Sequence, residues 1–340
     1  MSKYEVDIDL ANAAKKNMAK IMDLKNPRVL NKVGAFSSLY DITFPEYKEP
    51  VMVLKTEEPG SKQLLAAEYD KIENIAYDMI NHLINDCIVM GAKPLTVQDA
   101  IICGKLDKGV VERIVKAVAD ACSNQDCVLT GGETSEQPGV LEKGVFILTS
   151  SIVGIVEKSE VIDGGAIEEG DAVLALASSG IHTNGYTLVR KIMRDTPAIE
   201  NEVIDGKSFI DTILTPHRCY YTAVKDLFKT HEISGMAHIT GGGIKENLNR
   251  ILPQNLDAEI DLSKYKVLPI FKLLKKYGGV SDEEMIRTFN LGVGLTMVVK
   301  SRAVSRIIEH IKNFGIDCYE IGAIRNGMAS VILKNSLNWN

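Results

Sequence analysis

Apolar residues recur along this chain with two different periods, and these periods predict its helices and strands. From Ile72 to Met90 they are spaced three and four residues apart, which is typical of an amphipathic helix, and Gly91 ends it. Shorter apolar runs bounded by turn residues indicate strands. The expected strands are 33–40, 50–55, 95–102, 127–130, 146–156, 172–177, 236–239, 295–299, 318–324 and 329–333. The other expected helices are 9–22, 63–70, 110–123, 186–194, 244–252 and 302–314.

This alternation of strands and helices predicts an α/β fold. The length of 340 residues suits two domains. Gly164 and Gly165, followed by the acidic segment 168–171, mark the expected boundary between them. We therefore expect an N-terminal α/β domain of residues 1–165 and a C-terminal α/β sandwich domain of residues 166–340.

Composition and charge argue against several classes of protein. The net charge of -6 disfavours a protein that binds nucleic acid through phosphate contacts. No apolar run approaches the roughly 18 residues of a membrane-spanning helix, and the N-terminus does not resemble a signal peptide. The six cysteines show no CxxC spacing, so we expect reduced thiols in a cytoplasmic protein and no zinc site.

The stretch from Val128 to Gly139 carries the first candidate chemistry. Its apolar start predicts a strand that ends at Gly131 and Gly132, where positive φ angles would present Glu133 at a rim. Such a carboxylate suits Mg²⁺, which binds one or two protein carboxylates together with phosphate oxygens. The alternative is an ordinary glycine turn beside a solvated glutamate.

Other acidic positions in the first half of the chain extend this hypothesis. Glu57 precedes a turn that ends in a hydroxyl group and Lys62. Asp86 lies near the C-terminal end of its predicted helix, where the helix dipole disfavours a carboxylate and a bound cation would remove that penalty. Asp78 and His82, on the same helix, are expected to belong to a solvated polar face.

Two glycine-rich loops in the second half each follow a predicted strand and precede a predicted helix. The first loop is Ser178–Gly185 and the second is Thr240–Gly243. Such loops direct free N–H groups at an anion, although neither matches the P-loop or the dinucleotide fingerprint. His182 and His238 accompany them, as general acids or as polar caps. Together with the carboxylates, the loops suggest Mg²⁺-nucleotide chemistry on a phosphorylated substrate.

Several ordered motifs resemble the phosphoribosylformylglycinamidine cyclo-ligases, or aminoimidazole ribonucleotide synthetases, over most of the chain. The matching segments are 85–86 with 91–94, 104–107, 131–134 with 138–139, 153–159, 179–186 with 188–191, 238–243 and 287–290. The resemblance implies ATP-dependent closure of formylglycinamidine ribonucleotide to aminoimidazole ribonucleotide in purine biosynthesis, with release of ADP and phosphate. It also implies ATP and Mg²⁺ as cofactors, a homodimer formed through the N-terminal sheet, and a C-terminal domain that binds the substrate.

The resemblance further implies the residues of the site. Those assigned to ATP are Glu57, Gly60, Ser61, Lys62, Asp86, Gly131, Gly132, Glu133 and Thr134, of which Glu57, Asp86 and Glu133 would bind the metal. Those assigned to the ribonucleotide are Ser179, Gly180, His182, Thr183, Asn184, Gly185, Thr240, Gly241, Gly242 and Gly243. The candidate catalytic residues are His238, His182 and Lys62.

One motif departs from the family pattern and keeps other interpretations open. Where the family reads Asp-Gly-Val-Gly-Thr-Lys, this chain reads Glu57-Glu-Pro-Gly-Ser-Lys62. If φ is positive at Glu58, its side chain costs roughly 1–2 kcal/mol. An active cyclo-ligase is the first interpretation. The alternatives are a homologue that binds nucleotide or ribonucleotide without turnover, and a member of the same superfamily that acts on another substrate.

Overall fold

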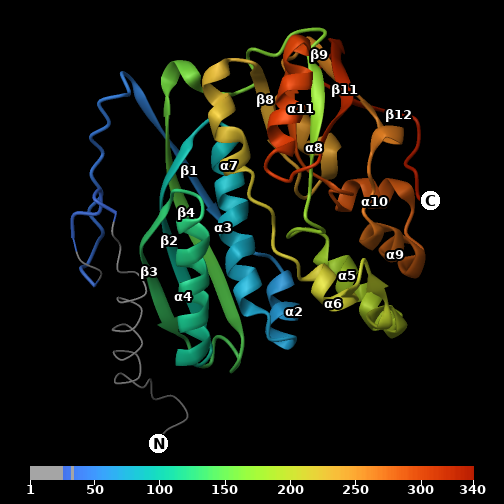
Figure 1. Ribbon diagram of the computed structural model, residues 1–340. Coiled ribbons are helices and arrows are strands. Elements are labelled where there is room, and N and C mark those ends of the chain that lie inside the picture. Colours follow the sequence, from blue (N-terminus) through green and yellow to red (C-terminus); the bar gives the residue numbers. More distant parts are fainter. Residues whose placement is uncertain (1–25, 32–33) are drawn as a thin grey trace, which may run out of the picture. The chain divides into compact units, whose positions relative to one another are not determined.

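The computed structural model describes residues 26–31 and 34–340, and the chain divides into two compact units (Figure 1). Unit 1 holds the described residues up to Cys87 together with Ala92–Ser159. Unit 2 holds Ile88–Gly91 and Glu160–Asn340. Each unit combines helices with a sheet, so the predicted α/β class is confirmed. The expected helix 9–22 lies outside the described residues.

Unit 1 is built on a four-stranded mixed sheet with the strand order β1-β4-β2-β3. Strands β2 and β3 are parallel, and the other neighbours are antiparallel. Its elements in chain order are β1 (Pro50–Glu57), α2 (Lys62–Glu68), α3 (Ile72–Ile88), β2 (Lys93–Cys103), α4 (Lys108–Ser123), β3 (Val128–Glu136) and β4 (Phe146–Glu157).

Helices α3 and α4 lie on the same side of this sheet (Figure 1). Ser150 Oγ of β4 lies 3.3 Å from Met79 Sδ of α3. A Cβ on Gly154 of β4 would lie only 2.3 Å from Cys87 Sγ, so this glycine makes room for the helix. Side chains alternate along each strand, and Met52 and Leu54 remain 63% and 67% exposed. The sheet therefore has exposed apolar side chains in addition to its packed face.

The structure corrects two strand predictions in this unit. Residues 34–40 form no strand, and Tyr40 makes only an isolated bridge to Val29 among the described residues. Strand β3 does not end at its glycines, because it continues to Glu136 and neither glycine has a positive φ. A Cβ on Gly132 would lie 1.9 Å from Oδ1 of Asp99 on β2. That glycine therefore makes room for a neighbouring carboxyl group and forms no hinge.

Unit 2 is built on a six-stranded sheet with the order β12-β9-β11-β5-β10-β8, in which only the β12–β9 pair is parallel. Strands β6 and β7 form a separate hairpin. Its elements are β5 (Ala172–Ala177), α5 (Tyr186–Asp195), β6 (Val203–Ile204), β7 (Lys207–Ser208), α6 (Phe209–Ile213), α7 (Tyr221–Val224), β8 (Ile233–His238), α8 (Gly243–Asn249), β9 (Leu256–Asp261), α9 (Pro269–Gly278), α10 (Asp282–Thr288), β10 (Val293–Val299), α11 (Val304–Lys312), β11 (Cys318–Asn326) and β12 (Val331–Lys334).

Short 3-10 helices join some of the elements in the described chain, at Lys158–Glu160, Pro197–Asn201, Lys225–Thr230, Leu262–Lys264 and Ser301–Ala303. None of the described helices is both long and apolar enough to cross a membrane. The six cysteines all lie in the described part of the chain, and none of them is in a disulfide.

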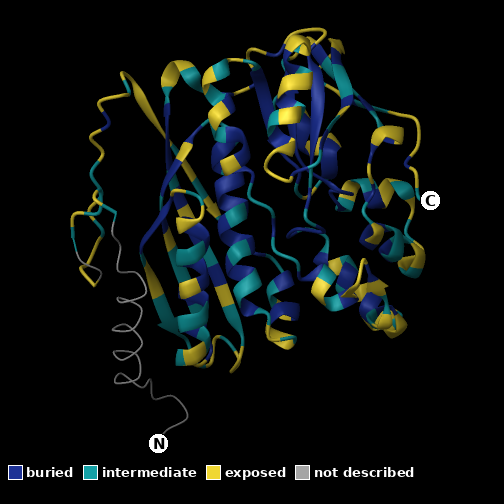
Figure 2. Ribbon diagram, in the orientation of Figure 1, coloured by how far each residue is buried: buried dark blue, intermediate teal, exposed yellow. Residues whose placement is uncertain are grey.

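Strands β5 and β8, on either side of β10, bring the two glycine-rich loops of unit 2 to one end of the sheet. Strands β8 and β10 are buried along their whole length and coloured dark blue in Figure 2. Because β10 is antiparallel to both β5 and β8, those two strands run in the same direction on either side of it. Their carboxyl ends, and the loops that follow them, therefore share an edge. The residues that precede β10 arrive at that edge as well.

Candidate active site

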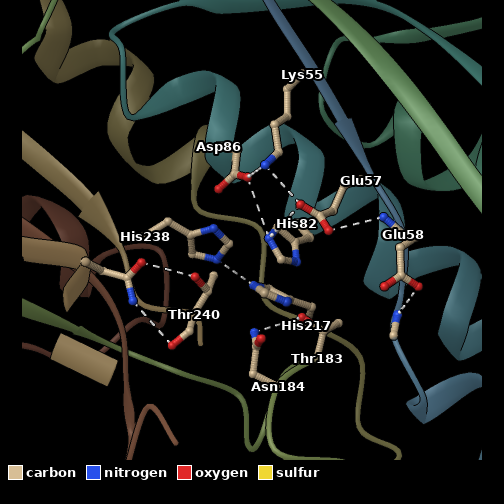
Figure 3. Close-up of polar contacts among 12 residues, drawn as sticks. Lys55, Glu57, Glu58, His82, Asp86, Thr183, Asn184, His217, His238 and Thr240 are labelled. Carbon is tan, nitrogen blue, oxygen red and sulfur yellow. Dashed lines mark hydrogen bonds and ion pairs between the residues drawn. The ribbon is translucent and has the colours of Figure 1, made fainter. Parts of the chain in front are cut away.

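Four polar side chains of unit 1 form a cluster between β1 and α3. Lys55 and Glu57 are two residues apart on the strand, and His82 and Asp86 are four apart on the helix, so each pair shares a face. Lys55 Nζ lies 3.0 Å from Glu57 Oε2 and 3.1 Å from Asp86 Oδ2 (Figure 3). His82 Nε2 lies 3.6 Å from each of the same two oxygens. We call these four residues the acidic cluster.

The acidic cluster brings together two of the three residues assigned to a metal, Glu57 and Asp86. Burial lowers the pKa of Lys55, but the adjacent Asp86 and Glu57 carboxylates outweigh this effect, and the pKa is raised. The Lys55 ammonium thus supplies the cation that the helix dipole favours beside Asp86. Glu133 lies on β3, three strand positions from β1, which corresponds to about 14 Å across the sheet. It is not part of this cluster.

Lys62 occupies a different place in unit 1 from the one expected. Its side chain is fully buried, and its Nζ lies 3.0 Å and 2.8 Å from the two carboxylate oxygens of Asp78. Burial lowers the pKa of Lys62, and the Asp78 carboxylate opposes that shift. The expectation that Asp78 and His82 lie on a solvated face is wrong, because both are buried. The ion pair between Lys62 and Asp78 joins the start of α2 to the middle of α3.

The turn between β1 and α2 tolerates its unusual sequence. Glu58 is not among the residues with a positive φ, whereas Gly60 has a φ of 67°. The cost considered for a side chain at position 58 therefore does not arise. Gly60 N–H donates to Glu58 Oε2 at 2.8 Å, and Ser61 occupies the N-cap of α2 without a side-chain cap bond. The glutamate thus helps to close the turn.

The remaining residues assigned to ATP lie on the edge strand β3. Gly131 and Gly132 are paired with Gln98 and Asp99 of β2, and Glu133 is exposed. Thr134 N–H donates to Glu133 Oε1 at 3.0 Å. These residues therefore lie within a strand, and not at a glycine turn that ends one as expected.

The first glycine loop of unit 2, residues 178–185, is held by Asn290, which lies three residues before β10. Asn290 Nδ2 donates to the carbonyl oxygens of Gly180 and Ile181, at 3.0 Å and 3.1 Å. Its Oδ1 accepts from Ser178 Oγ at 3.0 Å. Within the loop, His182 has a φ of 65°, which is uncommon for a residue with a side chain. Asn290 belongs to a motif that matched the family, but the sequence alone assigned it no role.

The second glycine loop, residues 240–243, is held by Asn247 of α8. Its Nδ2 donates to the carbonyl oxygens of Thr240, Gly241 and Gly243, at 3.3 Å, 3.1 Å and 2.8 Å. Figure 3 draws part of this network, in which Thr240 Oγ1 also donates to Asn247 Oδ1 at 3.2 Å. Because the carbonyl groups turn toward Asn247, the loop has a defined shape. Nothing in the sequence pattern indicated this function for Asn247.

The two glycine loops touch one another, as their common sheet edge requires. A Cβ on Gly241 would lie 3.2 Å from Asn184 Oδ1 of the first loop. Asn184 Nδ2 also lies 3.5 Å from Thr183 Oγ1, and Ser179 Oγ donates to Pro216 O at 2.7 Å. Residues assigned to the ribonucleotide from sequence segments far apart are thus brought to one surface of unit 2.

A third histidine, His217, joins His182 and His238 at this edge. Its Nε2 lies 2.9 Å from His238 Nε2 (Figure 3). Its ring stacks on that of His182, with 3.8 Å between centroids and 23° between planes. All three side chains are buried. His217 lies in the segment between α6 and α7 and was not predicted, because no periodic pattern leads to it.

The hydrogen bonds restrict where these histidines carry protons. Ser179 N–H donates to His182 Nε2 at 3.2 Å, so that nitrogen is an acceptor and the proton of a neutral ring resides on Nδ1. In the bond between His217 and His238, one Nε2 must donate and the other accept. When both rings are neutral, the donor ring therefore has an unprotonated Nδ1 and the acceptor ring carries its own proton on Nδ1.

These three histidines are close enough to suggest a metal site, but their geometry opposes one. Their candidate ligand atoms lie within 4.8 Å of one another. A metal ion lies in the ring plane of each histidine that binds it, and the stacked rings of His182 and His217 have nearly parallel planes. His182 Nε2 also accepts a backbone hydrogen bond. We therefore interpret the group as a proton-carrying pair stacked on a third ring.

Comparison with protein families defines the class of this chain. Residues 44–156 match the family described as AIR synthase related protein, N-terminal domain, and residues 168–334 match the corresponding C-terminal domain. The solved structure of thiamine-monophosphate kinase from Stenotrophomonas maltophilia has a TM-score of 0.69 at 16% identity, covering 96% of this chain and 97% of its own. HypE from E. coli has a TM-score of 0.68 at 16% identity, covering 97% of both chains. These two structures share the fold.

Full-length relatives narrow the class further. The phosphoribosylformylglycinamidine cyclo-ligase of Carboxydothermus hydrogenoformans is 40% identical over 336 residues, covering 97% of both chains. The protein of the same name from Streptococcus agalactiae is 40% identical over 332 residues, covering 97% of this chain and 96% of its own. The chain therefore belongs to the phosphoribosylformylglycinamidine cyclo-ligase family, which confirms the resemblance found in its motifs.

Proposed function

We propose that this protein catalyses the ATP-dependent closure of formylglycinamidine ribonucleotide to aminoimidazole ribonucleotide, a C–N bond-forming ligase reaction of purine biosynthesis. The observation that carries the proposal is 40% identity over 97% of both chains to a relative named for this activity. In the reaction, the terminal phosphoryl group of ATP is transferred to the formyl oxygen of the substrate. The amidine nitrogen then attacks the formyl carbon, and the formyl oxygen leaves as part of the phosphate.

We assign the ribonucleotide to the edge of unit 2 where the two glycine loops meet. The support is that the loops touch, that Asn290 and Asn247 hold their carbonyl groups, and that backbone N–H groups of glycine-rich turns suit phosphate. We propose that Ser179, Gly180, residues 182–185 and residues 240–243 contact the substrate there. The C-terminal domain of residues 166–340 is then the substrate domain.

We propose that His238 accepts the proton that the amidine nitrogen loses during ring closure. With its Nε2–H donating to His217, a neutral His238 can accept this proton at its unprotonated Nδ1, and its Nε2 proton can then pass to Nε2 of His217 through their shared hydrogen bond. His182 accepts a backbone N–H at Nε2, so we assign it to positioning the loop and the His217 ring. A catalytic role for Lys62 stays a prediction, and it would require the buried pair with Asp78 to open.

We propose that ATP binds to the N-terminal domain of residues 1–165. Mg²⁺ bound with the nucleotide would supply neutralisation of the phosphate charge. Glu57 and Asp86 fit a cation, since both already contact the Lys55 ammonium. Glu133, with its neighbours Gly131, Gly132 and Thr134, and Gly60 with Ser61 are the other proposed nucleotide contacts.

We also propose that the protein is a cytoplasmic homodimer joined through the exposed side of the unit 1 sheet. Met52, Leu54 and Ile147 are 63%, 67% and 41% exposed, although apolar side chains of this size favour burial. In the sheet register, Leu54 lies opposite Val153 and Met52 opposite Ile155. Sedimentation of the purified protein over a range of concentrations tests the dimer. A monomer at every concentration would contradict it.

The activity itself is tested by incubating the purified protein with ATP and Mg²⁺, with and without formylglycinamidine ribonucleotide. We expect ADP release that depends on the ribonucleotide and equals the aminoimidazole ribonucleotide formed. If a folded protein binds the ribonucleotide but forms no product, the enzyme proposal fails and the chain is a binding homologue. ADP release driven by a different acceptor would indicate another substrate.

A further inference from the structure

The Lys55 ammonium lies between the two carboxylates to which the proposed function assigns a metal. One atom, Nζ, makes both contacts, at 3.0 Å to Glu57 Oε2 and 3.1 Å to Asp86 Oδ2 (Figure 3). The arrangement is built by regular structure, since Lys55 and Glu57 share one face of β1 and Asp86 lies in the last turns of α3. A cation position is therefore present in this unit, and a side chain of the protein fills it.

We propose that Lys55 is a built-in cation, whose ammonium stands in for a divalent ion at Glu57 and Asp86 in the nucleotide-free protein. The inference rests on the proposed function only in naming these two carboxylates as metal ligands. If Lys55 fills the cation position, Glu57 and Asp86 have low affinity for free Mg²⁺ or Mn²⁺. The protein then does not collect a metal before the nucleotide arrives.

Distances show why the ammonium and a metal ion compete. Mg²⁺ binds oxygen at about 2.1 Å, so an ion on Glu57 Oε2 cannot lie further than about 5 Å from Lys55 Nζ. If it lies on the same side of the oxygens as Nζ, the two overlap. If it lies on the opposite side, two like charges are separated by only a few ångströms within a partly buried site. In either position, the ammonium must move away before the ion binds tightly.

Charge leads to the same conclusion. The two carboxylates and the ammonium together carry a net charge of about -1 when all three are ionised at neutral pH. Removing the ammonium leaves the two carboxylates without that fixed cation beside the C-terminal end of α3, where the helix dipole adds a further negative field. A divalent ion restores neutrality there. Loss of Lys55 should therefore turn a poor metal site into a good one.

The test is titration of the nucleotide-free full-length protein with Mn²⁺, with free Mn²⁺ measured by electron paramagnetic resonance. We expect Lys55→Met and Lys55→Gln to bind Mn²⁺ at least about tenfold more tightly than the wild type, a change of roughly 1.4 kcal/mol. Lys55→Arg keeps the charge and should bind as weakly as the wild type. Lys55→Met combined with Glu57→Gln should lose the gain, because one carboxylate is removed.

Lys116 provides a matched control in the same unit. Its Nζ lies 2.5 Å from Asp120 Oδ2 on α4, so Lys116→Met also breaks a lysine–carboxylate pair, but it leaves a single carboxylate of that pair behind. It should not change Mn²⁺ affinity. Circular dichroism of each variant confirms that it is folded, and two replacements of Lys55 are included in case one is not.

Two results would overturn the inference. One is unchanged Mn²⁺ affinity in both folded Lys55 variants. The other is a gain that persists when Glu57 is also replaced, which would show that the ion binds elsewhere. Neither result depends on turnover, because no substrate or ATP is present. Failure to form aminoimidazole ribonucleotide would refute the proposed activity and leave this titration intact.

Discussion

Replacing Asp99 with asparagine is expected to stabilise the protein more at pH 8 than at pH 5. Asp99 lies on β2 beside Gly132 of β3, where a Cβ on the glycine would come within 1.9 Å of Oδ1. Burial raises the pKa of Asp99 from 3.8 to about 7. Asparagine has nearly the same shape but cannot ionise. The variant therefore removes the cost of ionisation with little change in packing.

The direction of this pH dependence follows from comparing the protonation of Asp99 in the folded and unfolded chains. Between about pH 4 and pH 7, the unfolded chain loses the Asp99 proton while the folded chain keeps it. The wild type therefore loses stability as the pH rises through this interval, and the loss levels off above about pH 7. The Asp99→Asn variant would have no such loss, because its amide does not titrate.

The magnitude follows from the same two pKa values, 3.8 and about 7. Proton linkage gives a difference between pH 5 and pH 8 of about 2.6 kcal/mol, at 1.36 kcal/mol per pKa unit. This is an upper bound, because Asp99 is not completely shielded from solvent. We expect Asp99→Asn to gain about 1–2.5 kcal/mol relative to the wild type on going from pH 5 to pH 8.

The assay is urea unfolding followed by circular dichroism, at pH 5 and pH 8, for the wild type and Asp99→Asn. Glu142→Gln, at an exposed glutamate of the same unit, is the control and should give no pH-dependent gain. A change in stability that is equal at both pH values would refute the reasoning. It would mean that packing, and not ionisation of the partly buried Asp99 carboxyl group, determines the effect.

Three further substitutions test other parts of the molecule. Lys62→Met should destabilise the protein by about 3–5 kcal/mol in thermal unfolding, because it leaves the buried Asp78 carboxylate without its ammonium, and adding Asp78→Leu should recover much of the loss. His217→Phe keeps a stacked ring but removes the hydrogen bond to His238, so kcat should fall at least about tenfold with less than about threefold change in KM. Asn247→Leu releases three carbonyl groups of the second glycine loop, so KM for the ribonucleotide should rise at least about tenfold; an unchanged KM would contradict a substrate role for that loop.

Much of the fold could be predicted because local pattern and tertiary burial agree. Helix α3 repeats its apolar residues with a helical period, and it begins at Ile72 as expected and ends at Ile88, two residues before the expected end at Met90. Strand β5 is a continuous apolar run that becomes a buried central strand with the predicted bounds. Strand β9 was missed, although Leu256, Ala258 and Ile260 are buried and alternate with less buried residues. Its apolar residues alternate with Asp257, Glu259 and Asp261, so it has no continuous apolar run like that of β5.

The candidate site was predicted less completely, because side chains distant in sequence complete it. Asp78 seemed a surface residue until Lys62, sixteen positions away, was found beside it. His217 has no periodic neighbours, and only the packing of unit 2 brings it against His238. Gly132 was recognised as important, but a glycine needed for space has the same sequence signal as one needed for a turn. These two roles of a glycine can be distinguished only when the position of the neighbouring side chain, here that of Asp99, is known.

The measurement that most directly tests the central claim follows the oxygen atom of the formyl group. The purified protein is given ATP, Mg²⁺ and formylglycinamidine ribonucleotide labelled with ¹⁸O in the formyl group, and the products are analysed by mass spectrometry. If the formyl oxygen is phosphorylated before the ring closes, one labelled phosphate should appear for each aminoimidazole ribonucleotide formed. Unlabelled phosphate, or ADP formed without the imidazole product, would contradict the proposed ring closure.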